Sequence, residues 1–211
     1  MSGFDSSDEE NEENVRPVEP IRMDWLNLSH PDLCNTLALS SLPGCRFRDV
    51  QRNLQKDLDQ ISQAGISHAV VLMQTPEFRK YRVPDLVYEY EKRGISVLQV
   101  PLVDGGVPTP EEMMEILENL ENLIEQSGTR ILIHCYGGLG RTCLVAACFL
   151  MYLDPNLLPD SVISYLRNVR GPRAVQTVRQ WNFIHEFRTM EQEFLGNRNR
   201  LRDDSSRSVS R

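Results

Sequence analysis

Residues 134–142 read His134-Cys135-Tyr136-Gly137-Gly138-Leu139-Gly140-Arg141-Thr142, and the expected fold and chemistry both follow from them. The apolar run Ile131-Leu132-Ile133 before them predicts a buried strand, and the apolar run 143–153 after them predicts a buried helix. Backbone N–H groups of a glycine-rich loop at the start of a helix can all point at one oxyanion, and the positive end of the helix favours negative charge there. The pattern therefore predicts an oxyanion-binding loop that contains a cysteine.

The polar side chains of this stretch have separate expected roles. Cys135 is the candidate nucleophile, because the loop amides and the helix favour its thiolate form. Arg141 has a planar fork that can bind two phosphate oxygens at once. Thr142 can donate its hydroxyl to the thiolate, and His134 can support the loop. The predicted phosphate-binding loop consists of Tyr136, Gly137, Gly138, Leu139, Gly140 and Arg141.

A thiolate that attacks a phosphate ester also needs an acid to protonate the leaving oxygen. Asp104 is the candidate, because it follows the expected strand 96–102 and precedes two glycines, which places it on a loop. A cysteinyl-phosphate must then be hydrolysed by a positioned water. Gln176 and Gln180 are alternative candidates for that task, although a glutamine in the first turn of a helix usually faces solvent.

Strands that alternate with helices predict an α/β fold, with a mainly parallel central sheet and helices on both of its faces. Strands are expected at 25–28, 37–39, 66–73, 96–102 and 130–134, and helices near 54–61, 84–93, 110–124, 143–153, 162–169 and 178–194. The oxyanion-binding loop then follows a central strand, where open α/β sheets bind their ligands.

The length of 211 residues suits one domain with two tails. Of the net charge of −7, residues 1–24 contribute −6, from eight acidic and two basic side chains. We expect a disordered acidic tail at 1–22, a phosphatase domain at 23–196 and a flexible arginine-bearing tail at 197–211. Ser6 and Ser7 precede Asp8-Glu9-Glu10 and suit acidophilic kinases, and a solubilising tail is an equal alternative.

Composition excludes several classes of protein. Beyond the acidic tail the chain is near neutral, which argues against nucleic-acid binding. The five cysteines lack the spacing of a disulfide framework and predict a reducing compartment. Cys143 and Cys148 are expected to pack as small apolar residues, and Cys34 and Cys45 have no evident partner.

His30, His68 and His185 lack metal spacing, so no metal or other cofactor is expected. The longest apolar run, 143–153, is too short for a bilayer, and the polar start is unlike a signal peptide. A soluble, cytoplasmic protein is expected, with nuclear residence left open.

The loop, together with Leu42-Pro43-Gly44-Cys45-Arg46-Phe47, Lys80-Tyr81-Arg82-Val83-Pro84 and Asp104-Gly105-Gly106, resembles the dual-specificity-like cysteine phosphatases, and among them those that associate with kinases. The resemblance extends to both termini. It implies a cysteinyl-phosphate intermediate with Asp104 as the acid, 31 residues before Cys135. It further implies phosphothreonine on the activation segment of a cyclin-dependent kinase as substrate, phosphoserine and phosphotyrosine as further esters, and a role in restraining the cell cycle.

Other substrates and functions are weighed against this one. Phosphate-binding loops that act on inositol lipids usually have extra lysines, and this loop has none, which makes a lipid the less expected substrate. The sequence also shows no aromatic recognition loop like that of the strict tyrosine phosphatases, so a pocket for phosphotyrosine alone is not indicated. A monomer is expected. The main alternative function is an inhibitor that docks on the kinase, with catalysis secondary and with the final helix and the arginine-bearing tail as its docking surface. A thiol-based arsenate reductase or sulfurtransferase is a third, for which no resolving cysteine is in evidence.

Overall fold

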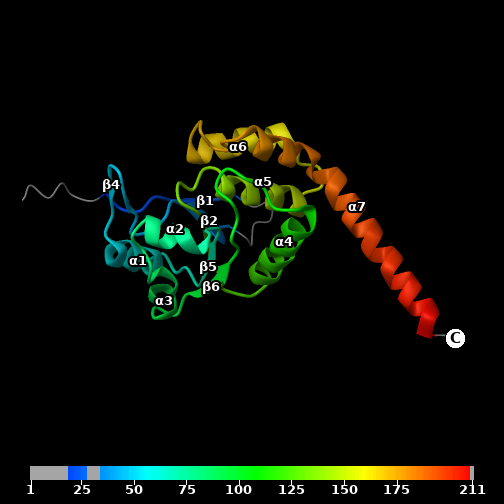
Figure 1. Cartoon of the computed structure of the whole chain (residues 1–211), viewed down its shortest axis with the longest axis horizontal. Helices are drawn as coiled ribbons and strands as arrows, with labels where there is room; N and C mark the ends of the chain where they lie inside the picture. Colours follow the sequence, from blue (N-terminus) through cyan, green and yellow to red (C-terminus); the bar gives the residue numbers. More distant parts are fainter. Residues whose placement is uncertain (1–18, 28–33, 210–211) are drawn as a thin grey trace, which may run out of the picture.

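The structure, a computed structural model, describes residues 19–27 and 34–209, with side chains through Arg200. Ser6 and Ser7 lie outside the described residues. A five-stranded sheet in the order β1-β2-β7-β5-β6 forms the centre (Figure 1). Its strands are β1 (Met23–Trp25), β2 (Leu37–Ser40), β5 (His68–Val71), β6 (Ser96–Gln99) and β7 (Ile131–His134). Only β1 runs antiparallel to its neighbour, so the predicted mainly parallel sheet is confirmed.

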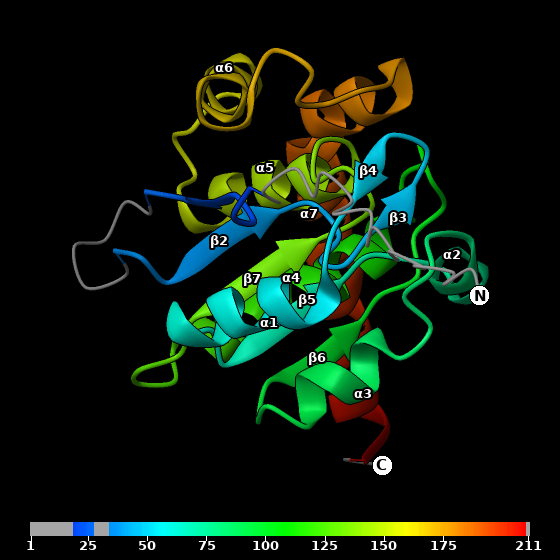
Figure 2. The same ribbon diagram turned by 90° about the vertical axis from the view of Figure 1, so that its left-hand side faces the viewer.

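Helices cover both faces of the sheet, as predicted. They are α1 (Leu54–Gln63), α2 (Thr75–Lys80), α3 (Leu86–Glu91), α4 (Pro110–Ile124), α5 (Arg141–Leu153), α6 (Pro159–Arg170) and α7 (Val178–Val209). Alternate strand residues point to opposite faces. Leu39, Val70 and Ile133 pack with residues of α4 to α7, whereas Ala69 and Leu132 pack with residues of α1 to α3. Figure 2 shows α1 and α3 in front of the sheet, with α4 and α5 behind it.

Helix α5 is the most deeply buried of the described helices. Every residue from Arg141 to Met151 is buried, because the helix lies against the sheet on one side and contacts α4, α6 and α7 on the others. A helix enclosed in this way is apolar all round, which accounts for the unbroken run that the sequence shows. Its first turn begins directly after the loop, at the carboxyl end of the third of the five strands.

Some local signals in the sequence are confirmed in detail and others were missed. Thr109 and Glu112 form a capping box at the start of the predicted helix α4, with backbone-to-side-chain hydrogen bonds of 3.2 and 2.8 Å. The sequence did not reveal α2, whose six residues are too few to show a helical period. It also did not reveal the hairpin of β3 (Arg46–Phe47) and β4 (Val50–Gln51).

The last helix is longer than predicted. We expected it to end near Phe194 and the chain to become a flexible tail from Asn197, but α7 continues to Val209 (Figure 1). The physical reason is that this segment holds no proline, and its single interruption, Gly196, costs only about 1 kcal/mol relative to alanine. The limits 23–196 proposed for the domain stay a prediction. No helix in the described part of the chain is long and apolar enough to cross a membrane.

Candidate active site

The loop between β7 and α5 has a backbone conformation that requires a glycine at position 138. Gly138 has a φ of +68°, in the left-handed region that favours glycine. A Cβ atom there would lie 2.2 Å from the carbonyl oxygen of Ser40 on the neighbouring strand. Arg170 of α6 holds the same glycine from outside, donating from Nε to its carbonyl oxygen at 3.2 Å. The loop is therefore fixed against two other elements of the fold.

Cys135 lies at the base of the loop and is 3% exposed. Its Sγ accepts a hydrogen bond from the backbone N–H of Gly138 at 3.3 Å. We expected Thr142 to donate to the sulfur, and this was wrong: its buried hydroxyl has no hydrogen-bond partner among the described residues. The tight turn at Gly138 aims a loop amide at the sulfur instead, so backbone rather than a side chain stabilises negative charge there.

Arg141 is buried and held in one orientation. Its Nη1 and Nη2 donate to the two carboxylate oxygens of Glu77 at 2.6 and 2.9 Å, and Nη1 also donates to the carbonyl oxygens of Leu72 and Leu102. Burial disfavours the charged guanidinium, but the Glu77 hydrogen bond and the surrounding negative groups raise the pKa of Arg141 overall. The buried Nε atom has no partner among the described residues, which leaves it available to an oxyanion.

Glu77 is the functional residue that the sequence analysis missed. It lies in α2, the helix that was itself not predicted, and 64 residues before Arg141. Two parallel N–H···O bonds between a guanidinium and a carboxylate are the strong, geometrically specific form of this pair. The only local signal in the sequence was a charged residue after Gln74-Thr75-Pro76, and the same pattern occurs in many surface turns.

Asp104 faces the same site from the loop after β6. Its carboxylate oxygen lies 3.1 Å from Nη2 of Arg141, while 64% of its side chain remains exposed. The two following glycines are fixed by the start of α7: Thr177 donates to the carbonyl oxygen of Gly105 at 3.0 Å, and Gln180 donates to that of Gly106 at 3.3 Å. The carboxylate is thus positioned near Arg141 and still reachable from solvent.

Cys135 and Asp104 line one cavity of about 550 Å³. Gln176 and Cys45 also contribute to its lining. Burial raises the pKa of the Cys45 thiol to about 11, so Cys45 stays protonated near neutral pH. A larger hollow of about 720 Å³, lined by residues 34–36 and 124–130, lies at the amino ends of β2 and β7 and lacks these groups.

The structure distinguishes the two candidate glutamines. Gln180 is fully buried, and both ends of its amide are occupied: Oε1 accepts from the backbone N–H of Gln176, and Nε2 donates to Gly106. Gln176 is exposed and lines the cavity, with its Oε1 beside Gly140 of the loop. Gln176 is therefore the glutamine that is free to contact a water in the cavity.

His134 is packed in the interior of the fold, directly before the loop. It is fully buried at the end of β7, and its ring lies 5.9 Å from that of Tyr90, centroid to centroid. Burial lowers the pKa of His134 to about 4, so the ring is neutral near pH 7. Within the part of the chain that the structure covers, no three His, Cys, Asp or Glu side chains come together as a metal site.

The chain is similar to known proteins over its whole length. A family model for cyclin-dependent kinase inhibitor 3 matches residues 1–163. Cyclin-dependent kinase inhibitor 3 of Homo sapiens is 45% identical over 210 residues, covering 100% of this chain and 96% of the relative. The crystal structure of kinase associated phosphatase with its catalytic-site cysteine replaced by serine is 44% identical, with a TM-score of 0.76 over 81% of this chain and 96% of that one. Tk-PTP in its active form is 32% identical, with a TM-score of 0.59 over 72% and 90%.

Proposed function

Because the chain belongs to the cyclin-dependent kinase inhibitor 3 family and is a protein phosphatase of the dual-specificity class, we propose that it dephosphorylates a cyclin-dependent kinase and so restrains the cell cycle. The ester is phosphothreonine of the activation segment, and phosphoserine and phosphotyrosine are also accepted. The observation that supports this proposal is that Cys135 and Asp104 line one cavity, with Nη2 of Arg141 3.1 Å from the Asp104 carboxylate.

In the first step the thiolate of Cys135 attacks phosphorus, a sulfur–phosphorus bond forms, and the phosphorus–oxygen bond to the side chain of the substrate breaks. Asp104 gives its proton to the leaving oxygen, which departs as a hydroxyl. The loop amides and the free Nε of Arg141 bind the oxygens of the phosphoryl group, where negative charge is concentrated. Glu77 keeps Arg141 in the orientation that this requires.

In the second step water replaces the cysteine. Gln176 orients a water in the cavity, and the Asp104 carboxylate accepts a proton from it as oxygen attacks the cysteinyl-phosphate. The sulfur–phosphorus bond breaks, inorganic phosphate leaves, and Cys135 returns as a thiolate. Asp104 thus acts first as acid and then as base, which is consistent with its exposed position at the mouth of the cavity.

The choice of a protein over a lipid substrate rests on the loop and on the relatives. The loop positions between Cys135 and Arg141 hold no lysine that would match the extra phosphates of an inositol lipid. Relatives that are 45–46% identical are named as inhibitors of a cyclin-dependent kinase.

The test compares phosphate release by wild type and by Cys135→Ser. The substrates are a phosphothreonine-bearing cyclin-dependent kinase, a phosphotyrosine peptide and a phosphoinositide, and Cys34→Ser is the matched control, since Cys34 is exposed and lies in the other hollow. We expect release from the kinase by wild type and Cys34→Ser only, with kinase binding retained in Cys135→Ser. Turnover near wild type in Cys135→Ser would contradict the assignment of the nucleophile.

A kinase-docking inhibitor is the second candidate function. It is favoured by the far end of α7, which extends away from the sheet (Figure 1) and belongs to the arginine-bearing segment. If wild type released phosphate from none of the three substrates and yet bound the kinase, this function would replace the phosphatase proposal.

A further inference from the structure

Basic side chains surround the opening of the candidate active site. Arg52 and Arg173 line the cavity itself. Cζ of Arg48 and Nζ of Lys80 lie over the ring of Phe47, at 5.3 and 5.5 Å from the ring centroid. Phe47 in turn contacts Tyr136, a cavity residue, edge to face with the ring centroids 6.1 Å apart. We refer to Arg48, Arg52, Lys80 and Arg173 as the basic rim.

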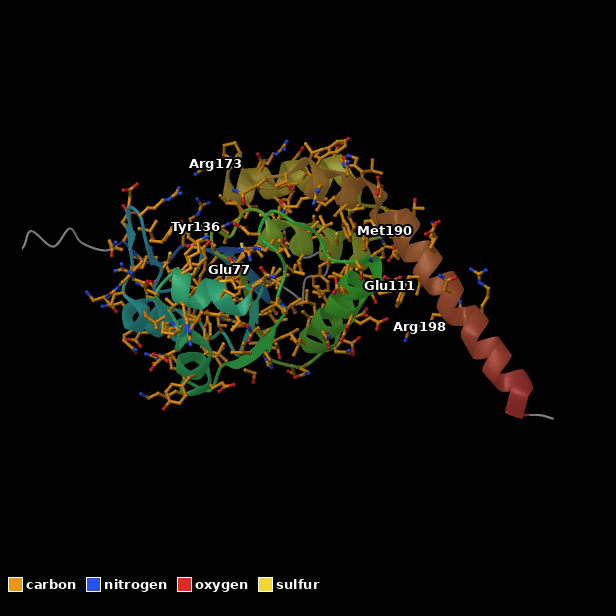
Figure 3. All side chains as sticks on the ribbon, viewed as in Figure 1. Glu77, Glu111, Tyr136, Arg173, Met190 and Arg198 are labelled. Atoms are coloured by element: carbon orange, nitrogen blue, oxygen red, sulfur yellow. The ribbon has the colours of Figure 1, made fainter. Side chains whose placement is uncertain are left out.

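The members of the basic rim differ in how far their charge is already neutralised. Arg52 donates to both oxygens of Asp57, at 2.7 and 2.8 Å, so its charge is largely satisfied within the fold. Arg48, Lys80 and Arg173 are exposed and form no salt bridge to another described residue, and Arg173 is the one of these three that lines the cavity. Figure 3 shows Arg173 between α6 and α7, on the side of the molecule where Tyr136 lies. Arg173 is therefore the rim cation most available to a substrate.

The basic rim is a local positive patch on a near-neutral body, because residues 1–24 contribute −6 of the net charge of −7. The phosphoryl group does not require these cations, because Arg141 and the loop amides already match its charge. Arg48 and Lys80 lie on the hairpin side of the cavity, and Arg173 lies on the α6–α7 side, so the cations flank the position of a bound phosphoresidue. Asp49, at the hairpin turn, is an acidic neighbour of Arg48 and offsets only part of this charge.

We propose that the basic rim binds acidic side chains of the substrate, so that the enzyme selects phosphoproteins with glutamate or aspartate next to the phosphorylated residue. This proposal rests on the proposed function and specifies its substrate. Arg173 contributes most to the selection, because it lines the cavity and a contact with substrate breaks no salt bridge to another described residue. Exposed charge pairs are weak and screened by salt, so the preference is a few-fold and fades as ionic strength rises.

The test measures kcat/KM of the full chain on matched phosphothreonine peptides that carry glutamate, or glutamine at the same positions, on both sides of the phosphoresidue. We expect wild type to prefer the glutamate peptide by about three- to tenfold at low salt, and by less than about twofold at 0.5 M salt. Arg173→Gln should lower this ratio by about two- to fivefold. Arg179→Gln is the matched control, because Arg179 is exposed, six residues further along and outside the cavity lining.

Three outcomes would overturn the proposal: equal rates on the two peptides, a preference that Arg173→Gln leaves intact, or faster turnover of phosphoinositide in anionic vesicles than of either peptide. Hydrolysis of the glutamine peptide tests the phosphatase activity independently of the preference for acidic substrates. If wild type hydrolyses it and Cys135→Ser does not, the phosphatase assignment holds even where the preference for acidic substrates fails.

Discussion

At the scale of single residues, the proposed mechanism assigns the proton donor to Asp104 and the positive charge on the phosphoryl oxygens to Arg141, and different substrates separate these two roles. Asp104→Ala should lower kcat by roughly 10²–10⁴-fold on a phosphothreonine peptide, because an alkoxide leaves poorly without a proton. On an activated aryl phosphate the loss should be much smaller, since its leaving group needs little protonation. Steady-state kinetics on both esters checks this, and an equal loss on both would count against the acid role.

Glu77 acts through Arg141 and so should show a different pattern. Glu77→Gln keeps the size of the side chain but replaces the carboxylate of a buried bidentate pair with a neutral amide. We expect kcat to fall by similar factors, on the order of tenfold or more, for both leaving groups, because the misplaced guanidinium binds the phosphoryl oxygens in either case. A competitive oxyanion such as vanadate should also bind less tightly. Unchanged vanadate affinity, in a variant that unfolds at the wild-type urea concentration, would contradict the positioning role.

At the scale of elements, the sequence predicted what is encoded locally. The run from His134 to Thr142 predicted both the loop and its place after a central strand, because strand, glycine turn and helix are contiguous in the chain. Glu77 and the Thr177–Gly105 contact could not be found in this way, since each joins segments far apart in sequence. The hydroxyl of Thr142 was assigned from chemistry alone, and the backbone geometry at Gly138 gave that hydrogen bond to an amide instead.

Helix α7 has two parts with different physical roles. Phe183, Ile184 and Phe187 are buried in the core, whereas the segment after Gly196 is attached to the body by the exposed pair of Arg198 and Glu118. An exposed pair of this kind contributes at most about 1 kcal/mol. Deleting residues 197–211 should therefore leave the urea midpoint and aryl phosphate hydrolysis close to wild type.

The same deletion tests the docking alternative. If the far end of α7 contacts the kinase, the truncated chain should lose affinity for the kinase and dephosphorylate it several-fold more slowly, with aryl phosphate turnover as the internal control. Equal rates on the kinase for the full and truncated chains would remove this segment from the docking surface. A large loss of stability would instead mean that α7 acts as one structural unit through its full length.

At the scale of the whole molecule, the buried His134 couples the stability of the fold to pH. Its pKa is lowered to about 4 in the folded state by burial, against 6.5 when the ring is exposed. Between these values the unfolded chain binds more protons than the folded one, so the free energy of unfolding decreases as pH falls through this window. A depression of this size corresponds to roughly 3 kcal/mol, which is a large part of the 5–15 kcal/mol typical of a domain.

We therefore expect the urea midpoint of wild type to fall steeply between pH 6.5 and pH 4.5, and that of His134→Gln to fall less, because glutamine does not titrate. Carboxylates that protonate in the same range are present in both proteins, so the difference between the two slopes isolates His134. His68→Gln is the matched control: burial also lowers the pKa of His68, but its ring is only partly buried, so removing it should flatten the slope by much less. If wild type and His134→Gln lost stability in parallel, the neutral buried ring would not be the group that couples the fold to pH.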